Sequence, residues 1–384
     1  MLHRIVCRAF AILGLAVALA AGVYRAAGAQ TMIPLTADRW TATDALRFEN
    51  YLGRPSLFID RGVALARGVA LRDGTIELDM ATPKGGNFMG AVFHASSADN
   101  SEVVFFRPGS SGTPDAMQYA PALNGVGAAW QIYHGDGANA APELAFGPWL
   151  HVRIDVAGSV AKVYLNDERE PALEVPRLAG VAGASLGVWT GAYGRGAYYS
   201  NIRYTARAPS APAPPAELPR GTITDWELSD AFDATSFKPG IAPNLAGMSW
   251  EKVHAEAQGF VLINRYRRAP ATSIPRDPAT GVPLADRIMG GPVAGAKVVL
   301  ARTVIQSDRD QIRRMLIGYT NGVEVYANGQ PLFFGMNPIV QPGLGYMNMI
   351  GDGVYVPLKR GSNEVVFAVT DFTAGWGFWA RLDP

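Results

Sequence analysis

Short runs of alternating apolar and polar residues recur along most of this 384-residue chain. Alternation places successive side chains on opposite faces of an extended strand, and short strands separated by turn residues are typical of antiparallel sandwiches. In the first half the predicted strands are TIELDMAT (75–82), FMGAVFHAS (88–96), EVVFFRP (102–108), WQIYHG (130–135), WLHVRIDVA (149–157), AKVYLNDE (161–168), SLGVWTG (185–191) and AYYSNIRYTAR (197–207).

The second half shows the same alternation, and no run of a dozen residues has a convincing helical period. We therefore expect little helix. Two hairpin turns are predicted, one at Ala157-Gly158-Ser159 and one at Asn328-Gly329, because these residues tolerate the backbone angles of tight turns. The predicted strands here are GFVLINRYRRA (259–269), KVVLARTVIQS (297–307), RRMLIGYT (313–320), GVEVYANGQPLFFG (322–335), GVYVPLK (353–359), NEVVFAVTDF (363–372) and GWGFWARL (375–382).

A segment rich in proline and alanine, residues 207–220, divides the two sets of strands. Such a segment favours an extended linker. The sequence thus predicts an all-β protein with two β-sandwich (jelly-roll) domains, at residues 30–206 and 221–384, joined by this linker.

Residues 1–29 have the features of a secretory signal peptide. Arg4 and Arg8 precede an apolar run, and small residues follow it before Gln30. The apolar run is shorter than the roughly 20 residues of a membrane span. The single cysteine, Cys7, lies in this leader, so the mature chain would have no disulfide and no thiol. We expect a secreted or periplasmic protein that does not insert into a membrane.

Charge argues against a nucleic-acid partner. The whole chain has a formal net charge of +1, and loss of the three leader arginines would leave the mature chain near −2. A nucleic-acid-binding protein usually has a basic patch or an excess of positive charge. Nothing in the sequence indicates an oligomeric state.

The first half resembles the laminin-G-like or concanavalin A-like jelly rolls of exported bacterial proteins. The resemblance covers GTIELDM, the region from GAVFHASS to WQIYHG, and LGVWTGAYGRGAYYSNIRY, and is greatest to the 3-keto-disaccharide hydrolase domains. The second half, through GVEVYANGQPLF and VPLKRGSNEVVF, is similar to galactose-binding-like jelly rolls. The matching positions are Asn328, Gly329, Leu358, Lys359, Gly361 and Asn363. The resemblance implies a sugar-associated fold, which by itself fixes no activity.

Catalytic chemistry has three weak candidates: Glu77, Asp79 and Asp115. Glu77 and Asp79 are two apart on a predicted strand, so their carboxylates face one side, about 6.6 Å apart, near the separation of an inverting glycosidase pair. Glucanases on the resembled fold have a third acid on this strand, and Met80 to Pro83 supply none. A solvated strand face is the simpler interpretation.

The spacing of the histidines does not indicate a metal site. The histidines of the mature chain form no H-E-x-x-H or similar pattern. We therefore expect no metal and no cofactor. Calcium at the oxygen-rich segment SSADNSE (96–102) is the one alternative, although a polar turn is the favoured interpretation of that segment.

A carbohydrate ligand is the favoured partner, because aromatic rings stack on sugar rings while amides and guanidinium groups pair with hydroxyls. If the predicted strands are neighbours, four side chains share the concave face of the first sandwich: His94, Arg107, Gln131 and Tyr133. A loop would add further contacts: Asp115, Gln118, Tyr119, Asn124 and His134. In the alternative interpretation Arg107 pairs with Asp115 to pin the loop, and Tyr119 fills the core.

The sequence therefore favours an exported carbohydrate-recognition protein that binds a polysaccharide or glycoconjugate. One alternative is a hydrolase of oxidised oligosaccharides, with carboxylates such as Glu77, Asp79 or Asp115 acting with His94 or His134. Another is a non-catalytic interaction module of a surface assembly, which would show a broad flat apolar patch in place of a groove.

Overall fold

The computed structural model describes residues 28–86, 88–125, 129–191, 195–214, 217–268, 295–337, 345–349, 351–371 and 375–383. In these residues regular structure is almost entirely β-strand, which confirms the predicted all-β class. Within the described ranges no helix is long and apolar enough to cross a membrane. The helical segments are single 3-10 turns: η1 (Ala37–Arg39), η2 (Pro108–Ser110), η3 (Ala234–Ser236), η4 (Ile263–Arg265) and η5 (Met347–Met349).

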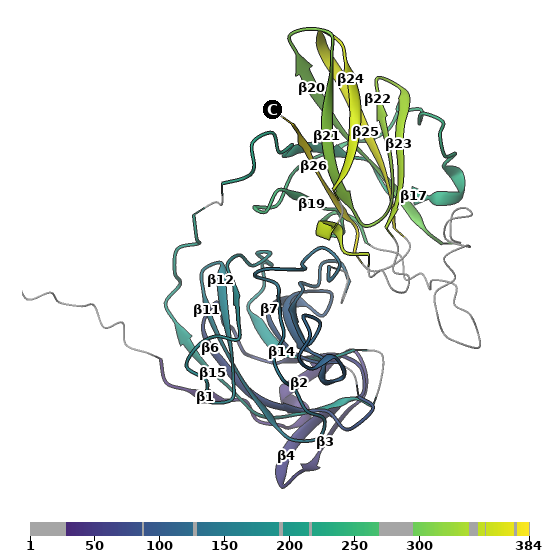
Figure 1. Ribbon diagram of the computed structural model, residues 1–384. Coiled ribbons are helices and arrows are strands. Elements are labelled where there is room, and N and C mark those ends of the chain that lie inside the picture. Colours follow the sequence, from purple (N-terminus) through teal and green to yellow (C-terminus); the bar gives the residue numbers. More distant parts are fainter. Residues whose placement is uncertain are drawn as a thin grey trace, which may run out of the picture.

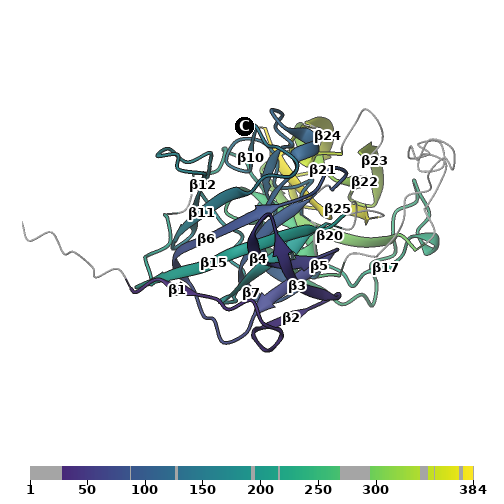
Figure 2. The same ribbon diagram turned by 90° about the horizontal axis from the view of Figure 1, so that it is seen from below.

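The first sandwich consists of two antiparallel sheets, which we name sheets A and B. Sheet A has the order β13 (Leu173–Val175), β12 (Val160–Leu165), β11 (Leu150–Ala157), β6 (Asp73–Ala81), β15 (Ala197–Arg207), β4 (Arg54–Ile59) and β3 (Leu46–Tyr51), and β1 (Thr31–Met32) pairs with β15. Sheet B has the order β10 (Asn139–Ala140), β9 (Met117–Tyr119), β8 (Asn100–Phe106), β7 (Met89–Ser97), β14 (Ser185–Thr190), β5 (Gly62–Ala66) and β2 (Trp40–Ala42). Figure 2 shows the central strands of sheet A side by side.

Alternation along the strands produces the core, as predicted. On β11, Val152, Ile154 and Val156 are buried, whereas His151 and Arg153 point outward. Inward residues of β6 meet inward residues of β7 and β8 in one apolar cluster. The predicted hairpin between β11 and β12 is confirmed, because Ala157 pairs with Val160 across a two-residue turn.

The second sandwich contains sheets C and D. Sheet C has the order β18 (Glu251–His254), β16 (Asp225–Leu228), β20 (Lys297–Ser307), β25 (Gly361–Asp371), β22 (Asn321–Ala327) and β23 (Gln330–Asn337), with β17 (Phe232–Asp233) beside β20. Sheet D has the order β19 (Phe260–Leu262), β26 (Gly377–Leu382), β21 (Gln311–Tyr319) and β24 (Asp352–Leu358). The Asn328-Gly329 turn is confirmed, since both residues have positive φ and Ala327 pairs with Gln330.

The predicted strand WQIYHG (130–135) is wrong. Residues 129–134 form tight turns, in which the N–H groups of Ile132 and Tyr133 both donate to the carbonyl of Ala129. We name residues 129–134 the junction turn, because it lies where the two sandwiches meet (Figure 1). Its apolar residues belong to a core cluster that also contains Phe260 and Met347 of the second sandwich.

Gln131 in the junction turn bonds to the second sandwich through its side chain and its backbone. It is fully buried; its Nε2 donates to the carbonyl of Gly345 (3.1 Å), and its Oε1 accepts from the N–H of Gly375 (3.0 Å). Its own carbonyl accepts from the N–H of Met347 (2.9 Å). Because these groups are out of water, each bond that is lost would leave a buried polar group unpaired.

Aromatic stacking and further amide bonds extend this junction. The rings of His134 and Tyr346 stack with centroids 3.4 Å apart, and Trp130 meets Tyr346 edge-on. Asn124 donates through Nδ2 to the carbonyls of Asn264 (2.9 Å) and Arg265 (3.1 Å). The two sandwiches are thus joined by directional bonds as well as by apolar contact.

We predict that Gln131→Ala destabilises the protein by about 1–3 kcal/mol, because it leaves the Gly375 N–H and the Gly345 carbonyl buried and unpaired. Chemical denaturation of both proteins measures the difference. Gln306→Ala is the matched control, since the side chain of Gln306 is exposed and bonds to Ser362 at the surface. That substitution should change stability by less than about 0.5 kcal/mol, and equal losses in the two variants would contradict the prediction.

Candidate functional site

The residues expected on one concave face do not share an exposed surface, so that geometric prediction is wrong. Gln131 and Tyr133 are buried at the junction, and His94 is buried with its Nε2 2.5 Å from the carbonyl of Arg72. The strand register shifts after Phe93, and His94 has a φ of +48°. Period-two alternation therefore no longer predicts the direction of the His94 side chain.

Arg107 and Asp115 form the loop contact of the simpler interpretation. Nη1 of Arg107 lies 3.7 Å from Oδ2 of Asp115, and its guanidinium group lies over the ring of Phe88. The other carboxylate oxygen of Asp115 accepts from the hydroxyl of Tyr346 (2.8 Å). Asp115 is thus engaged on both oxygens, so the structure gives no support for it as a catalytic acid.

The remaining predicted residues of the loop bond inside the protein. Gln118 is buried and donates to the carbonyls of Trp130 and Tyr133, which fixes the shape of the junction turn. Tyr119 fills the core, as the simpler interpretation predicted; its hydroxyl donates to Glu102 (2.6 Å) and accepts from the N–H of Ala179 (2.7 Å). Burial and the Glu102 charge raise the pKa of Tyr119 well above its usual range.

Glu77 and Asp79 lie on the outer face of sheet A, where both contact His151 on the neighbouring strand. Nδ1 of His151 donates to Oδ1 of Asp79 (2.7 Å), and its Nε2 lies 3.8 Å from Glu77. Nη2 of Arg203 donates to Glu77 (2.9 Å), while Arg54 and Asn201 reach Asp79 from β4 and β15. The sequence pattern placed the two acids on one face, but it did not indicate these partners from distant strands.

Both carboxylates of this cluster are held in the charged form. The hydrogen bond from Arg203 lowers the pKa of Glu77 despite partial burial. Burial alone would raise the pKa of Asp79, but hydrogen bonds from His151 and Asn201 outweigh it, and the net pKa is lowered. A glycosidase needs one acid that stays protonated near neutral pH. The cluster therefore has the electrostatics of a structural ion-pair network.

The segment considered for calcium forms the turn between β7 and β8. Its Asp99 pairs with Arg268 (3.1 Å), and its Glu102 points into the core toward Tyr119. The carboxylates therefore point in different directions. Within the described residues, no group of three or more His, Cys, Asp or Glu side chains is arranged to hold a metal ion.

A cavity of about 640 Å³ lies at the junction of the two sandwiches and the linker. We name it the junction cavity. Its aromatic residues are Tyr119, Tyr133, Phe260 and Trp379, and its polar residues are His134, Asp136, Arg177, Thr222, Gln258, Asn348 and Arg381. Three residues of the sequence-predicted set, Tyr119, Tyr133 and His134, thus line a cavity, but one that the second sandwich and the linker help to form.

Trp379 and Arg381 are the outward-facing residues of β26 in this wall. The indole of Trp379 lies over Gly318, which has no room for a Cβ beneath the ring. No hydrogen-bond or ion-pair partner for the Arg381 guanidinium is found among the described residues. Arg177, from the first sandwich, donates to the linker carbonyls of Ala213 and Pro214. The sequence predicts a strand here, GWGFWARL (375–382), but alternation alone does not reveal that a neighbouring domain borders it.

His134 presents a neutral imidazole to the cavity. Burial against Tyr346 lowers its pKa, although the nearby Asp115 charge opposes that effect. Its Nδ1 is buried with no hydrogen-bond partner among the described residues, so its Nε2 is the ring nitrogen that can pair with a ligand hydroxyl. The cavity therefore combines an indole plane with amide, guanidinium and imidazole groups.

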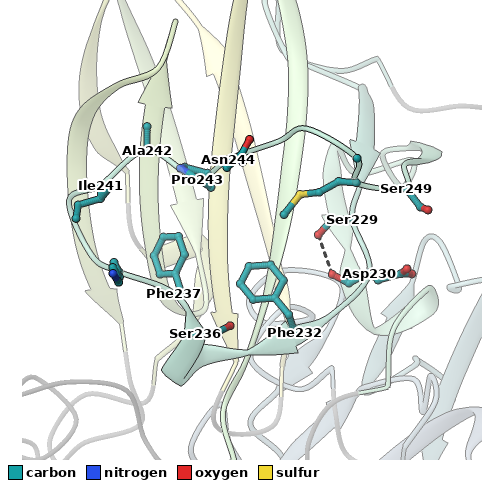
Figure 3. Close-up of a pocket in the computed structure, with 13 residues that line it drawn as sticks. Ser229, Asp230, Phe232, Ser236, Phe237, Ile241, Ala242, Pro243, Asn244 and Ser249 are labelled. Carbon is teal, nitrogen blue, oxygen red and sulfur yellow. Dashed lines mark hydrogen bonds between the residues drawn. The ribbon is translucent and has the colours of Figure 1, made fainter.

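A second cavity, of about 580 Å³, lies within the second sandwich. Figure 3 shows the rings of Phe232 and Phe237 beneath the loop that holds Ile241, Ala242 and Pro243. This loop covers an apolar patch on the outer side of sheet C. Its lining also contains polar side chains, and its acid Asp230 is largely exposed. It differs from the junction cavity in that its described lining residues all come from the second sandwich and include no tryptophan or tyrosine.

No family model matches the chain, and no curated protein matches it. Among solved structures, it is similar to a carbohydrate-binding module, CBM66, from Bacillus subtilis (15% identity, 43% of this chain and 93% of that chain, TM-score 0.34). It is also similar to a β-glucanase from Bacillus licheniformis (12%, 47% and 99%, TM-score 0.31). A third similar structure is domain 4 of an extracellular arabinanase from Geobacillus stearothermophilus in complex with arabinotriose (13%, 44% and 84%, TM-score 0.29).

The ion-pair network predicts a pH-dependent stability. Because the folded pKa of Glu77 is lowered, its contribution is present above its unfolded pKa and is lost as pH falls through the folded value. We expect Arg203→Gln to lower the free energy of unfolding near pH 7. Between about pH 6 and pH 3, the free energy of unfolding should fall less in the variant than in the wild type. Denaturation at several pH values tests this, with Arg302→Gln, in the other sandwich, as the control. An unchanged slope for Arg203→Gln would refute the prediction.

Proposed function

We propose that the protein is an exported carbohydrate-recognition protein and that a saccharide binds in the junction cavity. The observation that supports this most directly is the composition of the cavity: a partly exposed indole faces a space bordered by fixed polar groups from both sandwiches. Its volume lies within the roughly 300–1,000 Å³ of small-molecule sites. Aromatic planes suit the apolar faces of sugars, and amides and guanidinium groups suit their hydroxyls.

The position of the cavity also supports a binding role. Ligand sites occur preferentially where domains meet, since both domains contribute groups to one space. Here the bonds of Gln131, Asn124 and Tyr346 fix the two sandwiches to each other. The walls that the two sandwiches contribute to the cavity are thereby joined before a ligand arrives, which reduces the entropy cost of binding.

Two sequence features complete the proposal. The leader-like residues 1–29 support export. Outside the cytoplasm, polysaccharides and glycoconjugates would be available as ligands. The resemblance to the 3-keto-disaccharide hydrolase and galactose-binding-like domains supports a sugar ligand. Hydrolysis is less well supported, since Glu77 and Asp79 are ion-paired and both have lowered pKa values.

We predict that Trp379→Ala weakens saccharide binding about 3- to 10-fold, because it removes the stacking surface of the cavity. Affinity electrophoresis of the mature protein through gels with neutral and acidic polysaccharides identifies a ligand, and calorimetric titration then compares the variants. Trp250→Ala is the matched control. It removes a partly buried tryptophan of the same sandwich, stacked on Arg302 and outside the cavity.

The control should bind like the wild type, and thermal denaturation should show that both variants are folded. Equal binding by Trp379→Ala and the wild type would place the saccharide elsewhere. Failure of every polysaccharide to retard the wild-type protein would overturn the proposal itself.

A further inference from the structure

The outer face of sheet D continues directly from the junction cavity. Trp379 and Arg381, which line the cavity, pair across the sheet with Gly318 and Leu316 of β21. Farther along β21, Arg314 pairs with Tyr355 of β24. Because side chains alternate along strands, Trp379, Arg381, Leu316, Arg314 and Tyr355 all lie on this one face.

This face keeps large side chains in solvent, whereas the other face of the sheet packs into the core of the second sandwich. Tyr355 and Ile312 are 67% and 70% exposed, whereas Met315 and Val354 on the inner side are buried. Ile312 lies beyond Arg314 on β21. Arg314 is held beside Tyr355 by an ion pair with Asp383 (2.6 Å). An exposed ring beside a positioned guanidinium is a combination that stacks on and hydrogen-bonds to a ligand.

The distance from Trp379 to Tyr355 along this face exceeds the length of one sugar ring. Two strand spacings separate β26 from β24, which is roughly 10 Å, and the four-residue offset from Gly318 to Arg314 adds about 13 Å along the strands. A ligand that contacts both Trp379 and Tyr355 must therefore be an extended chain. The two aromatic residues lie at opposite ends of the face, with Arg381 next to the cavity.

Charge favours an acidic chain. Arg177 and Arg381 bring two positive charges to the cavity, and Asp136 is the one acid among its described lining residues. No carboxylate of the described residues pairs with Arg381, so its guanidinium is available to a ligand. A guanidinium group binds a carboxylate through two parallel hydrogen bonds, which is stronger than a contact with a neutral hydroxyl.

We propose that the ligand is an extended oligosaccharide with carboxylate groups, of the uronate class. One end occupies the junction cavity, a carboxylate pairs with Arg381, and the chain continues over the outer face of sheet D to Tyr355. This inference rests on the proposed function, and it adds the length, the charge and the direction of the chain.

Calorimetric titration with digalacturonate, hexagalacturonate and the neutral hexamer cellohexaose tests the inference. The wild type should bind hexagalacturonate at least about tenfold more tightly than either of the other two. Tyr355→Ala should reduce the ratio of hexamer to dimer affinity about 3- to 10-fold, because the far contact is lost. Arg381→Gln should reduce the preference for the acidic hexamer over the neutral one.

Phe334→Ala is the matched control, since Phe334 is a ring 56% exposed on the other sheet of the same sandwich. It should keep the wild-type affinities. Equal affinity for dimer and hexamer, or tighter binding of cellohexaose, would overturn the inference. Neutral-sugar binding that depends on Trp379 but not on Tyr355 would contradict the inference and leave the proposed function intact. No binding to any saccharide would contradict both the inference and the proposed function.

Discussion

The buried amide of Gln131 is the contact on which the arrangement of the two sandwiches depends. It bonds at once to Gly345 and Gly375, segments of the second sandwich that are distant in sequence. Apolar contact alone would let two sandwiches slide, since it has no preferred direction. Paired amides have defined geometry, and when buried they leave an unpaired group if the domains move apart. The same contact reaches the wall of the junction cavity, since the N–H of Met347, a lining residue, donates to the Gln131 carbonyl.

Much of the fold could be predicted from alternation and turn residues. The inward residues of β11 and the turns at Gly158 and Asn328 can be predicted because they depend only on the residue types within each segment. The direction of His94 could not be predicted, because a register shift reverses alternation without any marker in the sequence. Nor could the junction turn, whose alternating pattern also matches a short strand.

The dense polar and aromatic composition of residues 107–134 had two physical explanations. A ligand surface needs fixed rings, amides and charges, and so does a junction between two domains that must satisfy each other's backbone groups. Asn124 and Gln131 serve the second purpose, because their amides bond to backbone groups of the second sandwich. Gln118 contributes indirectly, because its amide bonds to carbonyls of the junction turn within the first sandwich. Sequence reasoning on one domain at a time cannot separate the two explanations, since the deciding partner lies more than a hundred residues away for Asn124 and Gln131.

The candidate site lies at the junction and not on sheet A because the charged groups of sheet A already have partners. The acids of sheet A meet arginine and histidine from adjacent strands, so their charges are already neutralised within one sandwich. Arg381 belongs to a short terminal strand whose outer face borders the other domain, and no described acid lies within ion-pairing distance of it. A cation left unpaired beside a partly exposed indole costs little while water solvates it, yet it gives binding energy to an anion that displaces that water. The junction therefore keeps a guanidinium group without an ion-pair partner among the described residues, whereas the acids of sheet A are already paired within their own sandwich.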